Sequence, residues 1–213
     1  MCSRPVSSGA VADRVVLVRH GETDWSARGL HTGRTDVPLN AEGEARARLL
    51  RPILAALAMV EGASVWTSPL ERARRTCELA GLGEHAVVVD DLVEWDYGEY
   101  DGVRTVDLRV ADPNWTIWTT TIRAGETLEA VGRRVDRVLA RLATAEGTVV
   151  LFAHAHLLRI LGARWCGFPP GGGAHLTMEP AAISVLGHER DTPVIVQWNT
   201  ASPEMPASPQ ARG

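Results

Sequence analysis

The chain has 213 residues, of which 45% are hydrophobic and 23% are charged, and its formal net charge is −4. This composition is typical of one globular domain with a full core, and the charge argues against nucleic acid and anionic membrane surfaces as partners. All 22 basic residues are arginine, which excludes chemistry that needs a lysine amine, such as a Walker A phosphate loop or a Schiff base.

Six short apolar runs predict strands. The first, Val15–Val18, has four consecutive apolar residues, which indicates burial on both faces of a sheet. The others are Val65–Thr67, Val87–Val89, Val149–Phe152, Ile183–Leu186 and Val194–Gln197. Residues 13–199 therefore form one predicted domain, with flexible segments expected at 1–12 and 200–213.

Four helices are predicted between these strands. Asn40 is a suitable cap for a helix over about 41–58, in which we expect Pro52 to introduce a kink or a division. Pro69 fits the first turn of a helix that runs to about Ala80 and stops at Gly81. Thr127 caps a helix over 128–143 with an apolar stripe on one face, and a fourth helix covers about 156–165.

The alternation of strands and helices predicts the α/β class, as a single three-layer domain with a mostly parallel sheet flanked by helices. Residues 81–86 are interpreted as a turn and Gly171–Gly173 as a flexible loop near the entrance of the site. Three widely spaced cysteines, and no signal-peptide or membrane-spanning pattern, favour a cytoplasmic location. A homodimer is compatible with this sequence.

Polar side chains suited to phosphate chemistry follow four of the predicted strands. The first strand leads into Arg19 and His20, the second into Ser68 and Arg72, the third into Glu94 and the fourth into His154. Because ligands of open α/β sheets bind beyond the carboxyl ends of the strands, we expect these side chains to share one crevice.

Such a group of residues can transfer a phosphoryl group through a covalent intermediate. His20 is a candidate nucleophile, and Arg19 and Arg72 would hold the phosphate oxygens and supply the positive charge that a metal would otherwise bring. His154, if protonated, would donate a further hydrogen bond, and Glu94 would give a proton to the leaving oxygen. We therefore expect no metal and no other cofactor.

These residues resemble the histidine phosphatase superfamily, and more narrowly its phosphoglycerate-mutase-like branch. The resemblance rests on four blocks in order: Arg19-His20-Gly21-Glu22-Thr23, Ser68-Pro69-Leu70 with Arg72 and Thr76, Glu94 ahead of Tyr97-Gly98, and His154 with Arg159. It implies that His20 is phosphorylated, that Arg19, Arg72 and His154 line the phosphate pocket, and that Glu94 is the proton donor. It also places Thr32 and Gly33 in a loop beside the phosphate.

Two positions depart from the pattern of this superfamily. Ser26 stands where Asn is frequent, which puts one phosphate contact in doubt, and Ala155 stands where Gly is usual, so that its Cβ could crowd the phosphate. His156 follows directly, and we interpret it as a structural or substrate-side residue and not as half of a metal pair with His154.

The resemblance favours a phosphatase of small phosphorylated metabolites over a mutase. The classical mutases carry a longer insertion with paired arginines, whereas Arg104–Ala124 is short and offers Trp115 and Trp118 as candidate substrate contacts that cap the pocket. Their spacing of three also suits burial in the core, so both roles stay open. The pattern looks most like acid and sugar-phosphate phosphatases of the sedoheptulose-bisphosphatase type. A mutase and an inactive relative that binds a phosphorylated ligand are the alternatives.

Overall fold

The fold is known from a computed structural model that describes residues 12, 14–56 and 62–201. Six strands form one sheet: β1 (Arg14–Arg19), β2 (Ser64–Thr67), β3 (Ala86–Val88), β4 (Thr148–Ala153), β5 (Ile183–Glu189) and β6 (Thr192–Thr200). Their order across the sheet is β3-β2-β4-β1-β5-β6, and the first four are parallel while β5 and β6 each run antiparallel to the preceding neighbour. All six predicted strands are confirmed.

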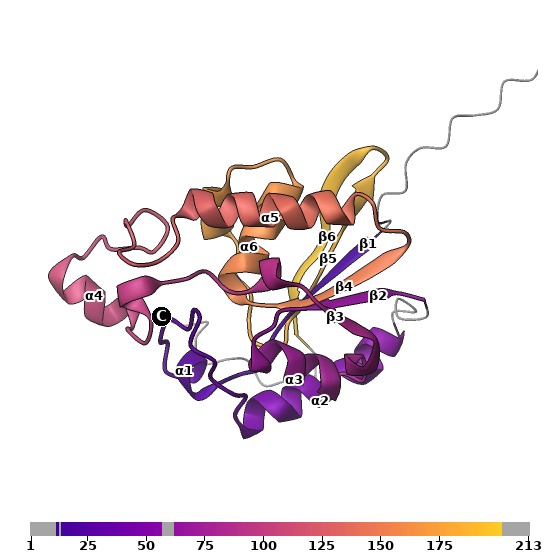
Figure 1. Cartoon of the computed structure of the whole chain (residues 1–213), viewed down its shortest axis with the longest axis horizontal. Coiled ribbons are helices and arrows are strands. Elements are labelled where there is room, and N and C mark those ends of the chain that lie inside the picture. Colours follow the sequence, from indigo (N-terminus) through magenta and orange to yellow (C-terminus); the bar gives the residue numbers. More distant parts are fainter. Residues whose placement is uncertain (1–11, 13, 57–61, 202–213) are drawn as a thin grey trace, which may run out of the picture.

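Helices cover both faces of this sheet (Figure 1). Helices α5 (Leu128–Leu142) and α6 (Ala155–Trp165) lie on one face, and α2 (Ala41–Ala56) and α3 (Glu71–Leu79) lie on the other. Successive residues of β1 explain the three layers, because Val15 and Leu17 pack toward α5 and α6 while Val16 and Val18 pack toward α2 and α3. The predicted three-layer α/β class is therefore confirmed.

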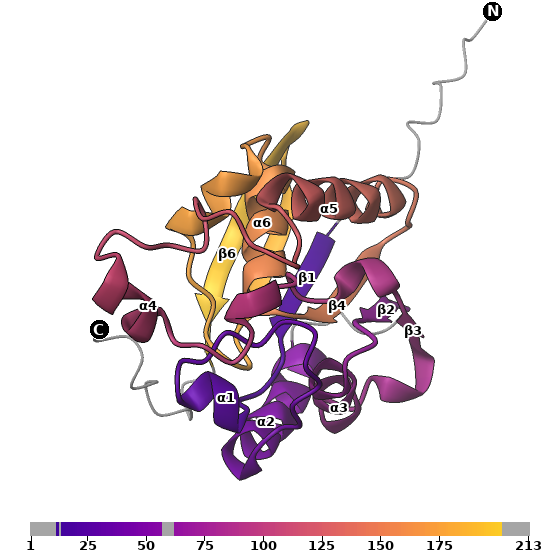
Figure 2. The same ribbon diagram turned by 60° about the vertical axis from the view of Figure 1, so that its left-hand side comes forward.

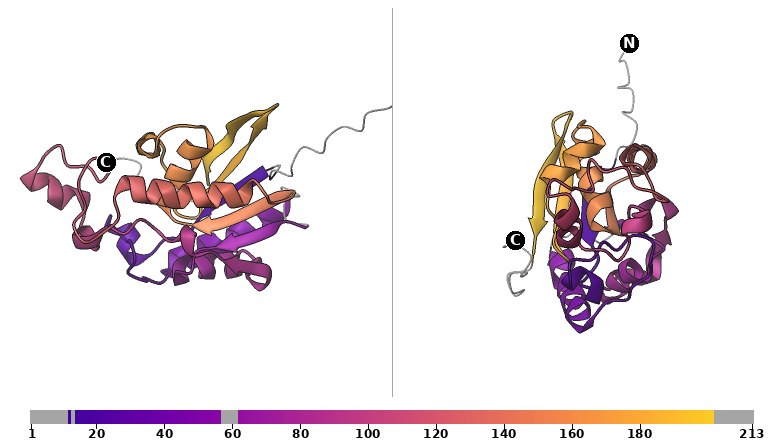
Figure 3. Two further views of the ribbon diagram at one scale, coloured as in Figure 1. Left: turned by 45° about the horizontal axis from the view of Figure 1, so that its top comes forward. Right: turned by 90° about the vertical axis from the view of Figure 1, so that its left-hand side faces the viewer.

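Two short helices stand at the end of the sheet where the parallel strands finish. Helix α1 (Asp24–Ala27) follows the turn after β1 and lies close to α2 (Figure 2), and α4 (Thr105–Ala111) extends beyond the strands (Figure 3). Four 3-10 helices complete the described elements: η1 (Gly83–His85), η2 (Asp90–Leu92), η3 (Gly98–Tyr100) and η4 (Pro170–His175). None of the described helices combines the length and the apolarity that a bilayer span requires.

Two helix termini agree with the expectations from the sequence. Thr127 caps α5, since its side chain accepts a hydrogen bond from the backbone N–H of Ala130. Gly81 follows the end of α3 with φ of +81°, a conformation that favours glycine.

Three local predictions need correction. Of the kink or division expected at Pro52, the division does not occur: helix α2 continues through Pro52, which is exposed, so that water can hydrate the carbonyl that loses its partner. Helix α3 begins at Glu71 with extended Leu70 as its cap, so Pro69 precedes the first turn. Gly171–Gly173 belong to η4, which packs on α6 and accepts a hydrogen bond from Arg159 at the Gly173 carbonyl (3.0 Å), so they form no open loop.

Several predictions fall at the chain ends and at one internal gap. The flexible segments expected at 1–12 and 200–213 and the expected end of the first helix at 57–58 lie largely outside the described residues. Within the described part, β6 extends through Thr200, one residue beyond the expected end of the domain.

Candidate active site

His20 lies directly after β1 and is held by backbone hydrogen bonds on both sides. Its N–H donates to the carbonyl of Ala153 (3.0 Å), and its carbonyl accepts from the N–H of Ala181 (3.1 Å). The side chain is 5% exposed, and its Nδ1 lies 2.7 Å from the carbonyl oxygen of Gly21. Because a carbonyl oxygen only accepts, Nδ1 carries the proton and Nε2 keeps its lone pair.

The surroundings of His20 favour the neutral imidazole. Burial, followed by the positive charges of Arg72 and Arg19, holds the pKa of His20 well below its ordinary value of 6.5. The ring is therefore neutral at neutral pH, with a free lone pair on Nε2, which is the state that a nucleophile at phosphorus requires.

Gly21 allows the His20 loop to lie directly against α2. A Cβ at Gly21 would stand 2.4 Å from the carbonyl oxygen of Gly43, so only glycine fits this approach. On the other side, the N–H of Gly21 donates to Oγ1 of Thr76 (3.0 Å), and that hydroxyl donates to the carbonyl of Arg72 (2.7 Å). The loop is thus fixed between α2 and α3.

Arg72, His154 and Ser68 form a buried hydrogen-bonded row beside His20. Nε of Arg72 donates to Nδ1 of His154 (3.2 Å), and Nε2 of His154 lies 2.8 Å from Oγ of Ser68. Since Nδ1 accepts, Nε2 carries the proton and donates to Ser68. The centroids of the His20 and His154 rings are 5.2 Å apart.

His154 is neutral in this arrangement. Burial is the main cause that lowers its pKa well below 6.5, and the neighbouring Arg72 charge acts in the same direction. The conditional expectation that a protonated His154 donates to phosphate is therefore not met in the structure described, because a proton on Nδ1 would break the bond from Arg72.

Arg72 also anchors the loop predicted to lie beside the phosphate. Its terminal nitrogens donate to the carbonyls of Thr35 (2.9 Å), Thr32 (3.2 Å) and Gly33 (2.8 Å). The carboxylate of Asp101 holds the same loop from the other side and accepts the N–H of Gly33 (2.6 Å). Gly33 is required here, since a Cβ would stand 2.8 Å from the carbonyl oxygen of Trp95.

Arg19 is half-buried at the cavity and keeps an unused donor. It donates through Nη1 to the carbonyl of Met178, while its buried Nε has no hydrogen-bond partner among the described residues. A guanidinium with an unused N–H is suited to bind a phosphate oxygen.

Glu94 is 4% exposed, and both of its carboxylate oxygens accept backbone N–H groups. Oε1 accepts from Trp95 (2.9 Å) and Leu157 (3.0 Å), and Oε2 accepts from His156 (3.1 Å). The carboxylate therefore caps the N-terminus of α6. An oxygen has two acceptor positions, so Oε2 retains one that can carry or receive a proton.

One cavity of about 180 Å³ brings most of the predicted residues together. Its lining contains the predicted catalytic residues Arg19, His20 and Glu94 and the predicted substrate residues Ser26, Thr32, Ala155 and His156. Arg72, His154 and Gly33 do not line the cavity. They are linked by the hydrogen bonds of Arg72, which also holds the cavity residue Thr32.

Ser26 and Ala155 take local roles in the two helices that border the cavity. Oγ of Ser26 accepts from the N–H of Thr23 (2.9 Å) and donates to its carbonyl (3.0 Å), which completes the capping box of α1. Ala155 is the first residue of α6, where its N–H faces no helical carbonyl.

Trp115 and Trp118 pack against His31 and His156, which line the cavity. Trp115 is 7% exposed and packs its ring edge against His31, with centroids 5.5 Å apart. Trp118 packs edge-on against His156 (5.1 Å) and beneath the guanidinium of Arg159 (4.7 Å). Neither side chain is part of the lining of this cavity, and substrate contact by Trp115 and Trp118 stays a prediction.

The residues on the remaining wall of the cavity were not singled out from the sequence as site residues. His31, Leu30 and Tyr97 line the cavity, and the Tyr97 hydroxyl lies 2.6 Å from Nδ1 of His156. Burial lowers the pKa of His31 to about 4 and that of His156 well below 6.5, so both rings are neutral. Tyr97 stands in a quoted motif, whereas a lone histidine in a loop carries no signal of its own.

Comparison with known proteins agrees with this fold. The profile of the histidine phosphatase superfamily (branch 1) matches residues 15–201. An acid phosphatase of Mycobacterium tuberculosis is 38% identical over 178 residues, which cover 83% of this chain and 87% of that protein. Sedoheptulose 1,7-bisphosphatase of Saccharomyces cerevisiae is 34% identical over 189 residues, covering 74% of this chain and 69% of that protein.

A solved structure extends the likeness to the fold. The product of an open reading frame of Mycobacterium tuberculosis superposes with a TM-score of 0.83 at 34% identity, and the match covers 88% of this chain and 97% of that one. The chain therefore belongs to the histidine phosphatase superfamily and is a phosphatase.

Proposed function

We propose that the protein hydrolyses small phosphate monoesters, namely sugar phosphates or related metabolites, through a phosphohistidine on His20. The observation that carries the proposal is the buried neutral His20, whose Nδ1 is bound to the Gly21 carbonyl and whose Nε2 is left to react. Arg19 and Glu94 line the same cavity and supply the charge and the proton that the reaction needs.

In the first step, Nε2 of His20 attacks phosphorus while the bond from phosphorus to the leaving oxygen breaks. Arg19 balances the charge on the phosphoryl oxygens, and the N–H of Ala155 at the start of α6 favours the same anion. When the phosphate dianion binds beside it, the negative charge favours the protonated form of Glu94, and Glu94 gives the proton on Oε2 to the leaving oxygen, so that the alcohol departs neutral.

In the second step, water attacks the phosphorus of phosphohistidine and the N–P bond breaks. The ionised Glu94 accepts the proton of the attacking water, which returns it to its starting state. His20 is released as the neutral tautomer, since Nδ1 keeps its proton toward Gly21 throughout. The buried Arg72, His154 and Ser68 row holds the pocket from behind.

The cavity favours a small and hydroxylated leaving group. Its volume of about 180 Å³ lies below the roughly 300–1,000 Å³ of pockets for drug-sized ligands. The wall formed by His31, Tyr97 and His156 presents neutral rings with polar atoms, which suit the hydroxyl groups and the apolar face of a sugar. We place this activity in the cytoplasm, in accord with the unpaired Cys77 and Cys166.

Product analysis separates this proposal from a mutase and from an inactive relative. With 3-phosphoglycerate, we expect free phosphate to appear faster than 2-phosphoglycerate; the reverse order would indicate a mutase. Turnover of p-nitrophenyl phosphate should persist in excess EDTA, fall with vanadate and disappear in His20→Ala. Absence of turnover in the unmodified protein would support the inactive alternative.

A further inference from the structure

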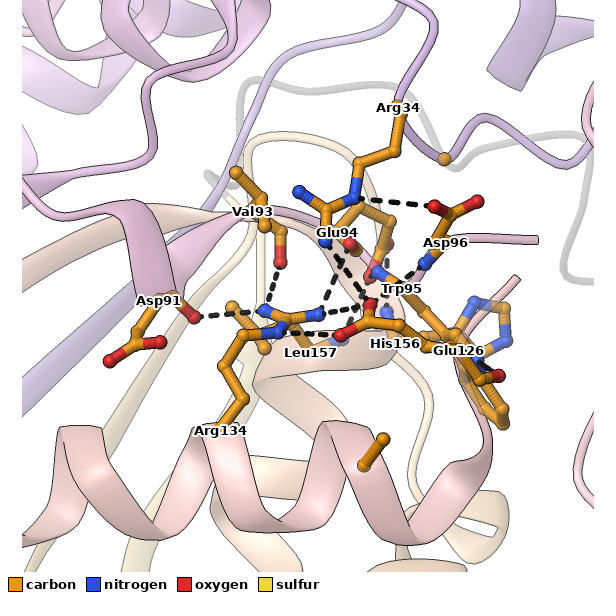
Figure 4. Close-up of polar contacts among 12 residues, drawn as sticks. Arg34, Asp91, Val93, Glu94, Trp95, Asp96, Glu126, Arg134, His156 and Leu157 are labelled. Atoms are coloured by element: carbon orange, nitrogen blue, oxygen red, sulfur yellow. Dashed lines mark hydrogen bonds and ion pairs between the residues drawn. The ribbon is translucent and has the colours of Figure 1, made fainter. Parts of the chain in front are cut away.

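Arg134 on α5 uses all five of its N–H groups, three on the backbone of the segment that carries Glu94 and two on the carboxylate of Glu126 (Figure 4). The side chain is 6% exposed. Its hydrogen bonds run from Nη1 to the carbonyls of Asp91 (2.9 Å) and Val93 (2.6 Å), from Nη2 to the carbonyl of Glu94 (3.2 Å) and to Oε2 of Glu126 (2.8 Å), and from Nε to Oε1 of Glu126 (3.1 Å).

Glu126 holds the same segment on the other side of Glu94. Its carbonyl accepts from the indole N–H of Trp95 (2.8 Å), and its Oε2 accepts from the backbone N–H of Asp96 (3.1 Å). The residues before and after Glu94 are therefore bound to one ion pair, in which Arg134 is buried and Glu126 is half-buried, as Figure 4 shows.

The segment needs such support because it has no strand ladder of its own. Residues 93–97 follow η2 without regular secondary structure, while their side chains reach the core and the cavity. Arg134 satisfies backbone carbonyls that a neighbouring strand would otherwise bind. On its opposite side, the Glu94 carboxylate meets the N–H groups of His156 and Leu157, so a small shift of the backbone would pull it away from α6.

We infer that Arg134, oriented by Glu126, is a positioning residue that sets the place of the Glu94 carboxylate for proton transfer. The inference rests on the proposed function, in which Glu94 serves the leaving group. Neither Arg134 nor Glu126 lines the cavity, so the pair acts on the reaction through the segment that carries Glu94. A purely stabilising pair would instead affect every substrate alike.

The test compares two substrates that differ in their need for a proton. Nitrophenolate leaves without protonation, whereas the alkoxide of glycerol 2-phosphate does not. Arg134→Lys keeps the positive charge, but a compact ammonium with three donors cannot span the five acceptors. We expect the rate of the phosphorylation step to fall on the order of 100-fold with glycerol 2-phosphate, since proton donation contributes roughly 10²–10⁴-fold. The nitrophenolate burst of the same variant should stay within about threefold of the unmodified protein.

Arg137→Lys is the matched control. Arg137 lies on the same helix and binds the Asp91 carboxylate at the surface, with a side chain that is 60% exposed, so both rates should be unchanged. Glu94→Gln should show the same split as Arg134→Lys, and the double variant should be no slower than Glu94→Gln alone. Glu126→Gln replaces Arg134→Lys as the test variant if circular dichroism shows that the latter does not fold.

Each other outcome overturns a defined part of the account. In one such outcome, Glu94→Gln slows the reaction of glycerol 2-phosphate but not that of p-nitrophenyl phosphate, while Arg134→Lys slows both reactions equally or neither. That result refutes the positioning role alone. A Glu94→Gln variant without the split refutes the proton-donor assignment, and the positioning role falls with it. Failure of both pair variants to fold would assign the pair to stability only.

Discussion

At the scale of single residues, the carbonyl of Gly21 selects the tautomer of His20. The bond from Nδ1 leaves Nε2 as the reacting atom, and burial together with two nearby guanidinium groups keeps the ring neutral. A neutral nucleophile needs no base to activate it, in contrast to a serine.

The neutral state of His20 can be observed directly. Its pKa is held well below 6.5, so its Nε2 resonance in ¹⁵N NMR should show no protonation as the pH falls from 7.5 to 5.5. The spectrum of His20→Gln assigns the signal. A midpoint at 6.5 or above in the free protein would contradict the proposed electrostatics.

The site residues that follow strands could be predicted from the sequence, whereas the residues that position them, such as Arg134, could not. His20, Glu94 and His154 follow strands, and the geometry of a parallel sheet gathers them at one edge. The role of Arg134 depends on where α5 crosses the segment after η2, which is a tertiary fact without a local pattern.

At the scale of elements, close backbone approaches place the loops around the cavity. Helix α2 meets the His20 loop through Gly21 and Gly43, and neither position has space for a Cβ. The long elements with clear periodicity were predictable, whereas α1 and α4 were not. Helix α1 has four residues, and the apolar residues Val106, Leu108 and Val110 of α4 alternate as they do in a strand.

Enlarging Gly21 tests this contact. In Gly21→Ala the new Cβ would meet the Gly43 carbonyl at 2.4 Å, so the loop must move. We expect a loss of about 1–3 kcal/mol in the free energy of unfolding, typical of overpacking, and a fall in kcat as His20 shifts. Urea unfolding and p-nitrophenyl phosphate turnover measure the two effects.

Gly171→Ala provides the comparison for Gly21→Ala. Its Cβ would meet only a side-chain atom of Leu128 at 3.8 Å, so stability and turnover should remain unchanged. If Gly21→Ala and Gly171→Ala have the same stability and the same turnover, the close approach of α2 to the His20 loop does not contribute to activity.

At the scale of the whole molecule, the domain places four neutral histidines at or behind one cavity, two of them buried and two half-buried. Burial is the main cause that lowers the pKa values of His20, His31, His154 and His156. Unfolded histidines take up protons as the pH falls through 6.5, whereas folded His31 does so only at about 4. Since the unfolded chain then binds more protons, acid shifts the equilibrium toward unfolding.

The free energy of unfolding should therefore be highest above pH 6.5 and decrease toward pH 4. Urea midpoints at pH 7.5, 6.5 and 5.5 measure this slope, which His31→Asn should reduce by removing one of the titrating groups. A free energy of unfolding that stays constant or rises as the pH falls from 7.5 to 5.5 would show that these histidines are not held as neutral rings.

The central claim is that phosphate passes through a bond to Nε2 of His20. Rapid mixing with ³²P-labelled substrate, alkaline quenching and peptide mapping test it most directly. We predict an acid-labile, alkali-stable label on the peptide that contains His20, formed and lost at rates that match turnover and absent in His20→Asn. A label on another residue, or full turnover in His20→Asn, would contradict the account.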